Sequence, residues 1–275
     1  MTENTTGTVS RADAIVEGLR AGELEWGRTS LAQRIAMLDR MADLVAERAQ
    51  EWVDLACEMK GLDANSPLVG EEWISGPWAV IGYIKALRQT LSVMERGGEV
   101  LEGVPSRTVG GRRTALKVLP HSIVDRLLLN GYSAEVWLQP GIGIDAARRT
   151  VGLGQRTPHE TAGRTFVLGA GNITSVVPSD VLYVLFADNR VAAVKLNPIS
   201  DCLEGVYRAI FAPFIETGAV EIITGDIEIG NALIHHPEIT AVHMTGSEAT
   251  HDAIVWGGGD TGTANKAAGT PLLRK

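Results

Sequence analysis

Small and basic residues follow three apolar runs in the second half of the chain, at places that suit a phosphorylated ligand. Lys195 lies at the end of one run, Gly225 follows the next, and Thr245, Gly246 and Ser247 follow the third. A lysine neutralises a phosphate, and glycine and serine at the start of a helix leave backbone N–H groups free for an anion. These residues therefore indicate a nucleotide site.

The same half of the chain alternates between strand-like and helix-like patterns, and this alternation would position those residues. Short apolar runs cover residues 165–168, 191–196, 220–224 and 239–244, and runs with helical spacing separate them. Such alternation predicts a parallel sheet with crossover helices. Ligands of parallel sheets bind at the carboxyl ends of the strands, so we expect the candidate residues to share one edge.

Each candidate also has a plainer interpretation. Lys195 alone is most often a surface lysine at a strand end, and Gly246-Ser247 alone is as often an ordinary helix start. No Gly-x-Gly-x-x-Gly fingerprint directly follows any of the apolar runs, and the chain has no Gly-Lys-Ser phosphate loop. Taken together in a strand–loop–helix context, however, the candidates favour nucleotide binding.

The rest of the chain is expected to form a scaffold around this core. We expect residues 1–10 to be a disordered tail and residues 11–275 to be one α/β domain with a Rossmann-like parallel sheet and flanking helices. Within that domain, residues 11–100 are expected to form an N-terminal helical layer. Residues 101–163 are expected to be irregular and rich in strands, and residues 164–275 to be the βαβ nucleotide-binding core.

Helix signals are strongest in the N-terminal layer. Ser30 and Gln33 have the spacing of a capping box, apolar residues then recur at steps of three and four, and Gly61 suits the helix end. A further helix is expected over residues 71–95, with an interruption at Gly76-Pro77. We expect the apolar faces of these helices to be core.

The middle of the chain has weaker signals. Residues 115–119, 122–129 and 134–138 are short apolar runs, and we expect each of them to be a strand. Residues 152–163 are rich in turn-forming residues and are expected to form a loop.

Composition excludes several classes of function. The formal net charge of −8 argues against a general nucleic-acid-binding protein, which needs a basic surface. The first ten residues are polar and contain no apolar run of the kind that a signal peptide has, and no run approaches the length of a membrane span. We therefore expect a cytoplasmic protein that binds neither nucleic acid nor a membrane.

Cysteine and histidine do not indicate a metal site. Cys57 and Cys202 are far apart, so neither a disulfide framework nor a cysteine-based zinc site is expected. The histidines between residues 235 and 251 lack the spacing of a metal-ligating motif. We expect no bound metal.

Four segments of the chain resemble the aldehyde dehydrogenase superfamily. Asn172 follows the first strand of the core, and Lys195 ends the second. Residues 243–247, His-Met-Thr-Gly-Ser, are similar to a Phe-Thr-Gly-Ser-type segment of the family. Residues 46–48, Ala-Glu-Arg, match part of its N-terminal helix. The resemblance covers roughly residues 20–270.

The resemblance implies an NAD or NADP site. By analogy with the family, Asn172 would stabilise an oxyanion, Lys195 would contact the adenosine ribose, and Gly246 and Ser247 would lie beside the pyrophosphate. The implied cofactor-binding residues are Lys195, Asn197, Gly225, Thr245, Gly246 and Ser247.

The chain departs from the family pattern at several of these positions. Leu196-Asn197-Pro198 stands where the family has Pro-Ser-Glu, so the usual acidic partner of the ribose is absent and the choice between NAD and NADP stays open. Asn197 either hydrogen-bonds a ribose hydroxyl or holds the turn. Gly171 replaces a large aromatic residue, and His251 replaces a glycine.

The family's catalytic residues are not expected in this chain. Members of the family continue with a Glu-Leu-Gly segment that carries the general base, and then with a domain that holds the nucleophilic cysteine. This chemistry needs both a thiolate and a base. Neither Cys57 nor Cys202 is expected to serve, so we expect the chain alone not to oxidise aldehydes.

Two interpretations remain. The chain is either the cofactor-binding half of an NAD(P)-dependent aldehyde dehydrogenase, or a non-catalytic nucleotide-binding module or truncated remnant. The first requires a separate chain that supplies the thiol and the base. The expected partners are thus a dinucleotide, such a catalytic chain, and a second copy of this chain in a homo-oligomer.

Overall fold

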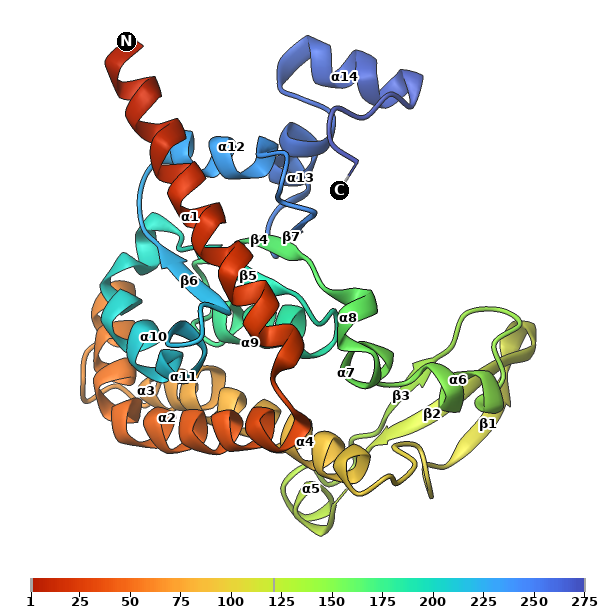
Figure 1. Ribbon diagram of the computed structural model, residues 1–275. Coiled ribbons are helices and arrows are strands. Elements are labelled where there is room, and N and C mark those ends of the chain that lie inside the picture. Colours follow the sequence, from red (N-terminus) through yellow and green to blue (C-terminus); the bar gives the residue numbers. More distant parts are fainter. Residues whose placement is uncertain (1, 121, 275) are drawn as a thin grey trace.

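The computed structural model describes residues 2–120 and 122–274 and shows an α/β core with a projecting arm (Figure 1). Met1 and Lys275, the outer ends of the expected tail and core, lie outside the described residues. The strands are β1 (Ser106–Val109), β2 (Arg113–Leu119), β3 (Ala134–Trp137), β4 (Arg164–Leu168), β5 (Val191–Lys195), β6 (Val220–Ile223) and β7 (Ala241–Met244). The helices are α1 (Thr2–Arg28), α2 (Leu31–Lys60), α3 (Val69–Trp73), α4 (Ala79–Glu95), α5 (Ile123–Leu128), α6 (Ile144–Thr150), α7 (Leu153–Arg156), α8 (Pro158–Thr161), α9 (Val176–Phe186), α10 (Glu204–Ile210), α11 (Ala212–Ile215), α12 (Ile227–His235), α13 (Glu248–Val255) and α14 (Gly259–Ala268). A π-helical segment, η1 (Ile74–Trp78), and two 3₁₀ segments, η2 (Gly110–Arg112) and η3 (Pro198–Leu203), complete the described elements.

The core is a parallel sheet with the strand order β6-β5-β4-β7. Its register pairs Val167 with Val194 and Leu168 with Lys195 on the two central strands, and Val194 with Ile222 on the next. Lys195 therefore ends its strand at the carboxyl edge of the sheet. The expected Rossmann-like parallel sheet, with flanking helices and an N-terminal helical layer, is confirmed.

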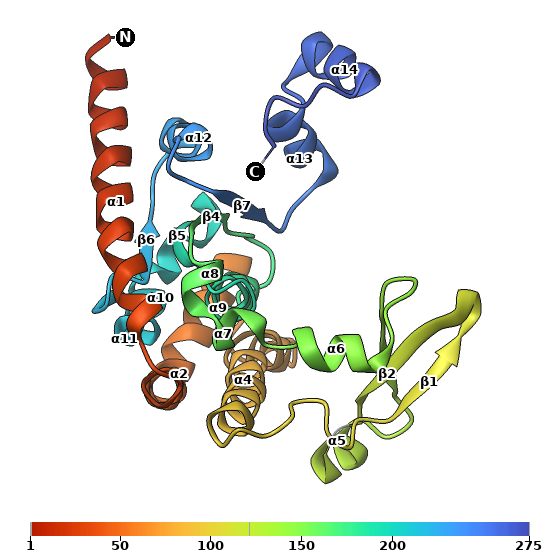
Figure 2. The same ribbon diagram turned by 45° about the vertical axis from the view of Figure 1, so that its right-hand side comes forward.

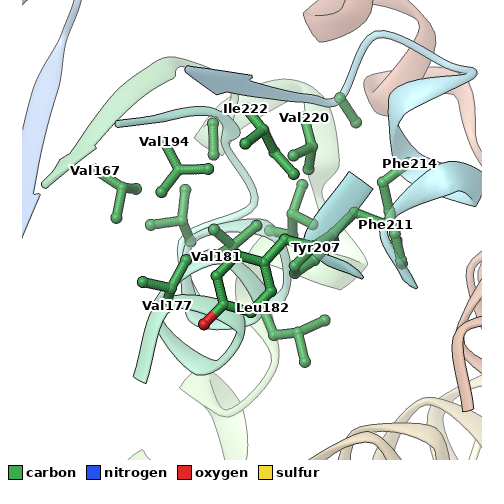
Figure 3. Packing of buried hydrophobic residues seen from close by; sticks show 14 of the residues in the cluster. Val167, Val177, Val181, Leu182, Val194, Tyr207, Phe211, Phe214, Val220 and Ile222 are labelled. Atoms are coloured by element: carbon green, nitrogen blue, oxygen red, sulfur yellow. The ribbon is translucent and has the colours of Figure 1, made fainter. Parts of the chain in front are cut away.

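One face of the sheet packs on α9 and α10. Figure 3 shows a row formed by Val167, Val194 and Ile222 beside Val181 of α9 and Tyr207 of α10. All five side chains are buried. Full burial of an apolar side chain of this size contributes roughly 1.5–3 kcal/mol, so this layer is a main source of stability.

The long helix α1 lies across the other face of the sheet and also contacts α12 (Figures 1 and 2). Ala12, Val16, Leu19 and Trp26 form its buried stripe, at the spacing of one helical face. The helix begins at Thr2, so residues 2–10 are helical and not the expected disordered tail. Once the stripe has docked, each added residue extends the helix at little further cost.

The backbones of α1 and of the turn before β6 meet at two glycines. Gly218 has a left-handed backbone with φ of 71°, and a Cβ on Gly22 would overlap the Gly218 carbonyl group. Gly22 thus lets α1 approach the sheet more closely than any residue with a side chain would.

The helical layer follows the expectations closely. Ser30 and Gln33 form a reciprocal capping box at the start of α2, and Gly61 ends that helix at φ of 65°. The second expected helix is interrupted at Gly76 and Pro77, where η1 separates α3 from α4. The apolar face of α2 is buried as expected.

A buried arginine joins this layer to the core. Arg34 of α2 is 1% exposed. Its guanidinium donates hydrogen bonds to Gln155 Oε1 at 2.5 Å, Asn189 Oδ1 at 2.7 Å and the Trp26 carbonyl oxygen at 2.6 Å. It also lies 3.8 Å from the centre of the Trp26 ring. Its Nε also donates to the Thr29 carbonyl oxygen at 3.2 Å. All four acceptors are neutral, and burial lowers the Arg34 pKa to about 10.

The arm is an antiparallel sheet of β1, β2 and β3 that projects away from the core, with α5 beside it (Figures 1 and 2). Residues 122–129, expected to be a strand, instead contain α5. The reason is a capping box, in which the hydroxyl of Ser122 accepts from the backbone N–H of Asp125 and the Asp125 carboxylate accepts from the backbone N–H of Ser122. Ile123, Leu127 and Leu128 of this helix are exposed.

Residues 152–163, expected to be a loop, contain the short helices α7 and α8. Packing rather than local propensity holds them, because Gln155 of α7 donates to the Phe186 carbonyl oxygen at 2.9 Å. Among the described residues, no helix is both long and apolar enough to cross a membrane.

Candidate functional site

A cavity of ≈ 640 Å³ opens at the carboxyl ends of β4, β5 and β7. It is lined by Leu168, Gly169, Ala170, Gly171, Asn172, Lys195, Leu196, Asn197, Pro198, Ile199, Met244, Thr245, Gly246, Ser247 and Thr250. Most of the residues expected to form the site are thus brought together. They come from three strand ends that are separate in sequence and adjacent in the sheet.

Gly225 is the expected site residue that the structure places elsewhere. It follows β6, the edge strand beside β5, and lines neither this cavity nor the smaller one described below. Its neighbours are Ile229 and Arg11 of α1, and Arg11 donates to the Thr224 carbonyl oxygen at 2.9 Å. Gly225 lies in the connection between β6 and α12, with φ of 141°.

Lys195 is buried, with 8% of its surface exposed. Its Nζ donates to the Leu196 carbonyl oxygen at 3.3 Å, and the described residues provide no other hydrogen bond to it. Burial lowers the Lys195 pKa, and the negative charges of Asp201 and Asp226 oppose that change. An ammonium group with one long hydrogen bond is poorly compensated, so it would gain from an anionic or hydroxyl-bearing ligand.

A second, smaller cavity of ≈ 210 Å³ shares Lys195 with the first. It lies between α12 and α13, and it is lined by Leu168, Lys195, Ile227, Gly230, Asn231, Ile234, His235, Thr250, Ala253 and Ile254. Gly230 faces the lysine, because a Cβ there would lie 3.5 Å from Lys195 Cδ. Lys195 therefore stands between a larger, open cavity and a mostly apolar slot.

Sequence reasoning missed this slot. Ile227, Gly230 and Ile234 of α12 recur at steps of three and four, which could have indicated a helix face. That face would have been assigned to the core, as such faces usually are, because only the placement of α13 opposite α12 leaves a gap beside it.

Glycines at the strand ends allow the backbone to pack closely around the larger cavity. Gly169 donates its N–H to the Lys195 carbonyl oxygen at 2.9 Å, and a Cβ there would lie 3.0 Å from the same oxygen. A Cβ on Gly171 would lie 2.9 Å from Asn197 Cγ. Asn197 Oδ1 in turn accepts from the Ile199 N–H at 3.1 Å. Asn197 thus holds the turn and leaves its amide N–H groups as donors.

Asn172 is exposed at the rim of the larger cavity, and its side chain has no hydrogen bond within the described chain. The loop that carries it is anchored directly after Asn172, at Thr174 and Ser175. Ser175 N–H donates to the Ser75 carbonyl oxygen at 3.2 Å, and the Tyr207 hydroxyl donates to the Thr174 carbonyl oxygen at 2.8 Å. The amide is therefore free to hydrogen-bond a ligand from a held backbone.

Asp180 of α9 organises the end of β7. Its carboxylate accepts from the Thr245 hydroxyl at 2.8 Å and lies 3.2 Å from His243 Nε2, while the Tyr183 ring lies 5.7 Å from the His243 ring. The hydrogen bond with Asp180 raises the His243 pKa. Because its hydroxyl is bonded to Asp180, Thr245 holds the segment after β7 in place. The neighbouring Gly246 and Ser247 also line the larger cavity.

Ser247 is the N-cap of α13. Its Oγ accepts from the Thr250 N–H at 3.2 Å and hydrogen-bonds the Thr250 hydroxyl at 3.0 Å. The start of α13 therefore lies at the larger cavity. The free backbone N–H groups and the dipole at a helix N-terminus favour binding of an anion there.

The described residues offer no thiol to either cavity. Cys57 is buried within α2, and Cys202 is exposed on η3. Desolvation raises the pKa of both thiols, at Cys202 through partial burial of the sulfur, and this disfavours the nucleophilic thiolate. No group of three histidine, cysteine, aspartate or glutamate side chains in residues 2–120 and 122–274 is arranged to hold a metal ion.

The likeness to known proteins is clear in sequence and in fold. The chain is 25% identical over 264 residues to the hydroxyisobutyraldehyde dehydrogenase of Mycolicibacterium austroafricanum. That match covers 94% of this chain and 41% of the relative. The chain resembles the aldehyde dehydrogenases. It spans less than half the length of this curated relative. No protein-family model matches the chain.

Solved structures give the same result for the fold of this aldehyde-dehydrogenase-like chain. The NAD-dependent benzaldehyde dehydrogenase of Corynebacterium glutamicum matches with a TM-score of 0.53 at 15% identity, over 90% of this chain and 42% of that one. Aldehyde dehydrogenase C of Pseudomonas syringae, solved with NAD+ and octanal, matches with a TM-score of 0.51 at 15% identity, over 97% and 41%. Proline utilization A of Bradyrhizobium japonicum matches with a TM-score of 0.56 at 17% identity, over 92% and 21%.

Proposed function

We propose that the chain is the cofactor-binding part of an NAD(P)-dependent aldehyde dehydrogenase. The observation that carries the proposal is Lys195, a buried ammonium group that lines both cavities at the carboxyl edge of the sheet. A ribose bound where the two cavities meet would contact Lys195 Nζ. In the described chain this Nζ has one long hydrogen bond, to the Leu196 carbonyl oxygen. The sequence likeness to an aldehyde dehydrogenase supports the reaction class.

The two cavities suit the two ends of a dinucleotide. The slot between α12 and α13 presents Ile227, Ile234 and Ile254, side chains that pack well on the faces of an adenine ring. The larger cavity would take the pyrophosphate beside Gly246 and Ser247 and the nicotinamide beyond them. When bound, the nicotinamide ring supplies the hydride acceptor of an aldehyde oxidation.

Asn172 would act on the substrate side. Its free amide at the rim of the larger cavity is a suitable hydrogen-bond donor for an oxyanion that develops on a substrate carbonyl. A preorganised donor of this kind stabilises negative charge in the transition state because its backbone is already held.

We further propose that these 275 residues do not oxidise aldehydes by themselves. Neither thiol lies at the cavities, and both thiol pKa values are raised. The thiol and the base would then have to come from other residues, either of the same protein or of a separate chain. A non-catalytic nucleotide-binding module is the alternative, and binding without turnover is common to both proposals.

Isothermal titration of the purified chain with NAD and NADP tests the proposal. We expect binding of at least one dinucleotide, and we expect Gly230→Leu to abolish it because the new side chain fills the adenine slot. Gly82→Leu is a matched control: Gly82 is also a helical glycine, with nothing within 4 Å of the Cβ position and no place in either cavity. No binding at millimolar dinucleotide, or equal loss in both variants, would sink the proposal.

A turnover assay with aldehyde, dinucleotide and added thiol tests whether the chain oxidises aldehydes by itself, independently of cofactor binding. We expect no NADH or NADPH formation above that of a protein-free blank. Turnover by the purified chain that is lost in a Cys57→Ser and Cys202→Ser double variant would contradict the proposal, because the chain would then supply its own thiol.

The arm is the surface we propose for association with a second copy of this chain. Ile123, Leu127, Leu128, Tyr132 and Trp137 are more than half exposed there. So many large apolar side chains on one projection are typical of an interaction site, because they would otherwise stay in contact with water.

Light scattering tests the association. We expect a mass above that of the 29.3 kDa monomer, and we expect Leu127→Glu to return the chain to that mass. Leu24→Glu is the control, since Leu24 is similarly exposed but lies alone on α1. A monomeric wild-type chain contradicts the proposal.

A further inference from the structure

The two cavities contain no carboxylate. None of the residues that line either of them is aspartate or glutamate, although the chain as a whole has a net charge of −8. Lys195 and the imidazole of His235 are the titratable side chains among the lining residues. The site is therefore locally basic in an acidic protein.

The polar groups around the junction of the cavities are donors more than acceptors. Lys195 Nζ has a single hydrogen bond, at 3.3 Å. The oxygen of the Asn197 side chain is used by the Ile199 N–H, so its NH2 group is what remains for a ligand. A bare ribose hydroxyl pair gains most from a carboxylate acceptor, whereas a phosphate on the ribose gains most from cations and N–H donors.

Two acidic residues lie within electrostatic range of Lys195 but outside the linings. Asp226 caps α12, where its Oδ1 accepts from the N–H groups of Glu228 and Ile229 at 3.1 and 3.2 Å. Asp201 lies on η3, and its Oδ1 is buried. Both favour the charged form of Lys195, so they help keep the ammonium cationic although neither residue lines a cavity.

We infer that the site prefers a dinucleotide with a 2′-phosphate on its adenosine ribose, that is, NADP over NAD. The inference rests on the proposed function and adds the chemical class of the ligand. Lys195 would pair with the phosphate, and the Asn197 amide would donate to it or to the ribose. The phosphate would compensate the buried positive charge of Lys195 with an ion pair. NAD has no 2′-phosphate and cannot form this ion pair.

Competing titrations with NADP and NAD test the inference on the full chain. We expect NADP to bind about tenfold or more tightly than NAD, the worth of one charge-assisted hydrogen bond. Lys195→Gln should bring the two affinities close to parity, while Lys195→Arg, which keeps the charge, should retain the preference. Lys85→Gln changes an exposed lysine outside both cavities and should leave both affinities unaltered.

A second pair of ligands isolates the phosphate from the rest of the dinucleotide. Adenosine 2′,5′-bisphosphate should bind more tightly than adenosine 5′-diphosphate, and added salt should reduce the difference because it screens the ion pair. Circular dichroism of Lys195→Gln checks that the variant is folded.

The outcomes separate this inference from the proposed function. Binding of NAD as tightly as NADP overturns the inference and leaves the proposed function standing. An NADP preference that persists in Lys195→Gln also overturns it, because the phosphate is then held elsewhere. If neither dinucleotide binds, the proposed function fails and the inference fails with it.

Discussion

Arg34→Met is expected to destabilise the fold by about 3 kcal/mol or more, because it leaves several buried acceptors without a donor. Gln155 Oε1, Asn189 Oδ1 and the Trp26 carbonyl oxygen each accept from the guanidinium. Methionine fills much of the space but donates nothing. The loss would loosen α7, the turn before β5 and the end of α1 together.

Urea unfolding followed by tryptophan fluorescence measures this effect. Arg48→Met is the matched control, since Arg48 lies on the same helix in an exposed pair with Glu51 at 3.0 Å. Exposed pairs of this kind contribute about 1 kcal/mol or less. Equal unfolding free energies for the two variants would contradict the role that we assign to Arg34.

The second large effect is expected at Gly22. Gly22→Ala would place a Cβ on the Gly218 carbonyl group, which is backbone and has no rotamer by which to move aside. Either α1 lifts from the sheet or the turn before β6 shifts, and we expect a loss of about 2 kcal/mol or more, within the range seen for overpacked sites. Thermal unfolding of the purified variant measures it.

Gly18→Ala is the control for that measurement. Gly18 lies one turn earlier on α1, and nothing lies within 4 Å of its Cβ position. Alanine there should stabilise the helix by about 0.5–1 kcal/mol, because it restricts the unfolded chain and suits a helix better. A Gly22→Ala variant that is as stable as Gly18→Ala would show that α1 does not sit as close to Gly218 as described.

Local signals made the helical layer and the sheet predictable. The capping box at Ser30, the stop at Gly61 and the break at Gly76 depend on residues close in sequence, and the structure has all three. Residues 122–129 were wrongly expected to be a strand, because an apolar run of that length fits either structure and the Ser122–Asp125 cap decides for a helix. The helix over residues 2–10 depends on docking of α1, which no local pattern reveals.

The site was predictable where it depends on strand ends. Lys195 and residues 245–247 follow strands of a recognisable parallel sheet, and the structure brings them to one cavity. Gly225 lies outside that cavity, which opens over β5, β4 and β7 and not over β6, and this strand order is not visible in the sequence. The slot between α12 and α13, and the link from Asp180 to Thr245, arise from tertiary packing alone.

The position of α1 has a consequence for the order in which the chain folds. The helix is synthesised before the segments on which it packs: Arg20 hydrogen-bonds Glu238, which lies 218 positions further on, and Arg11 hydrogen-bonds the carbonyl oxygen of Thr224. A growing chain must therefore hold an apolar stripe in water until most of the sheet exists. Contacts of such sequence separation carry a large loop-closure cost and slow folding. Docking of α1 is therefore expected to be a late step in the folding of this sheet.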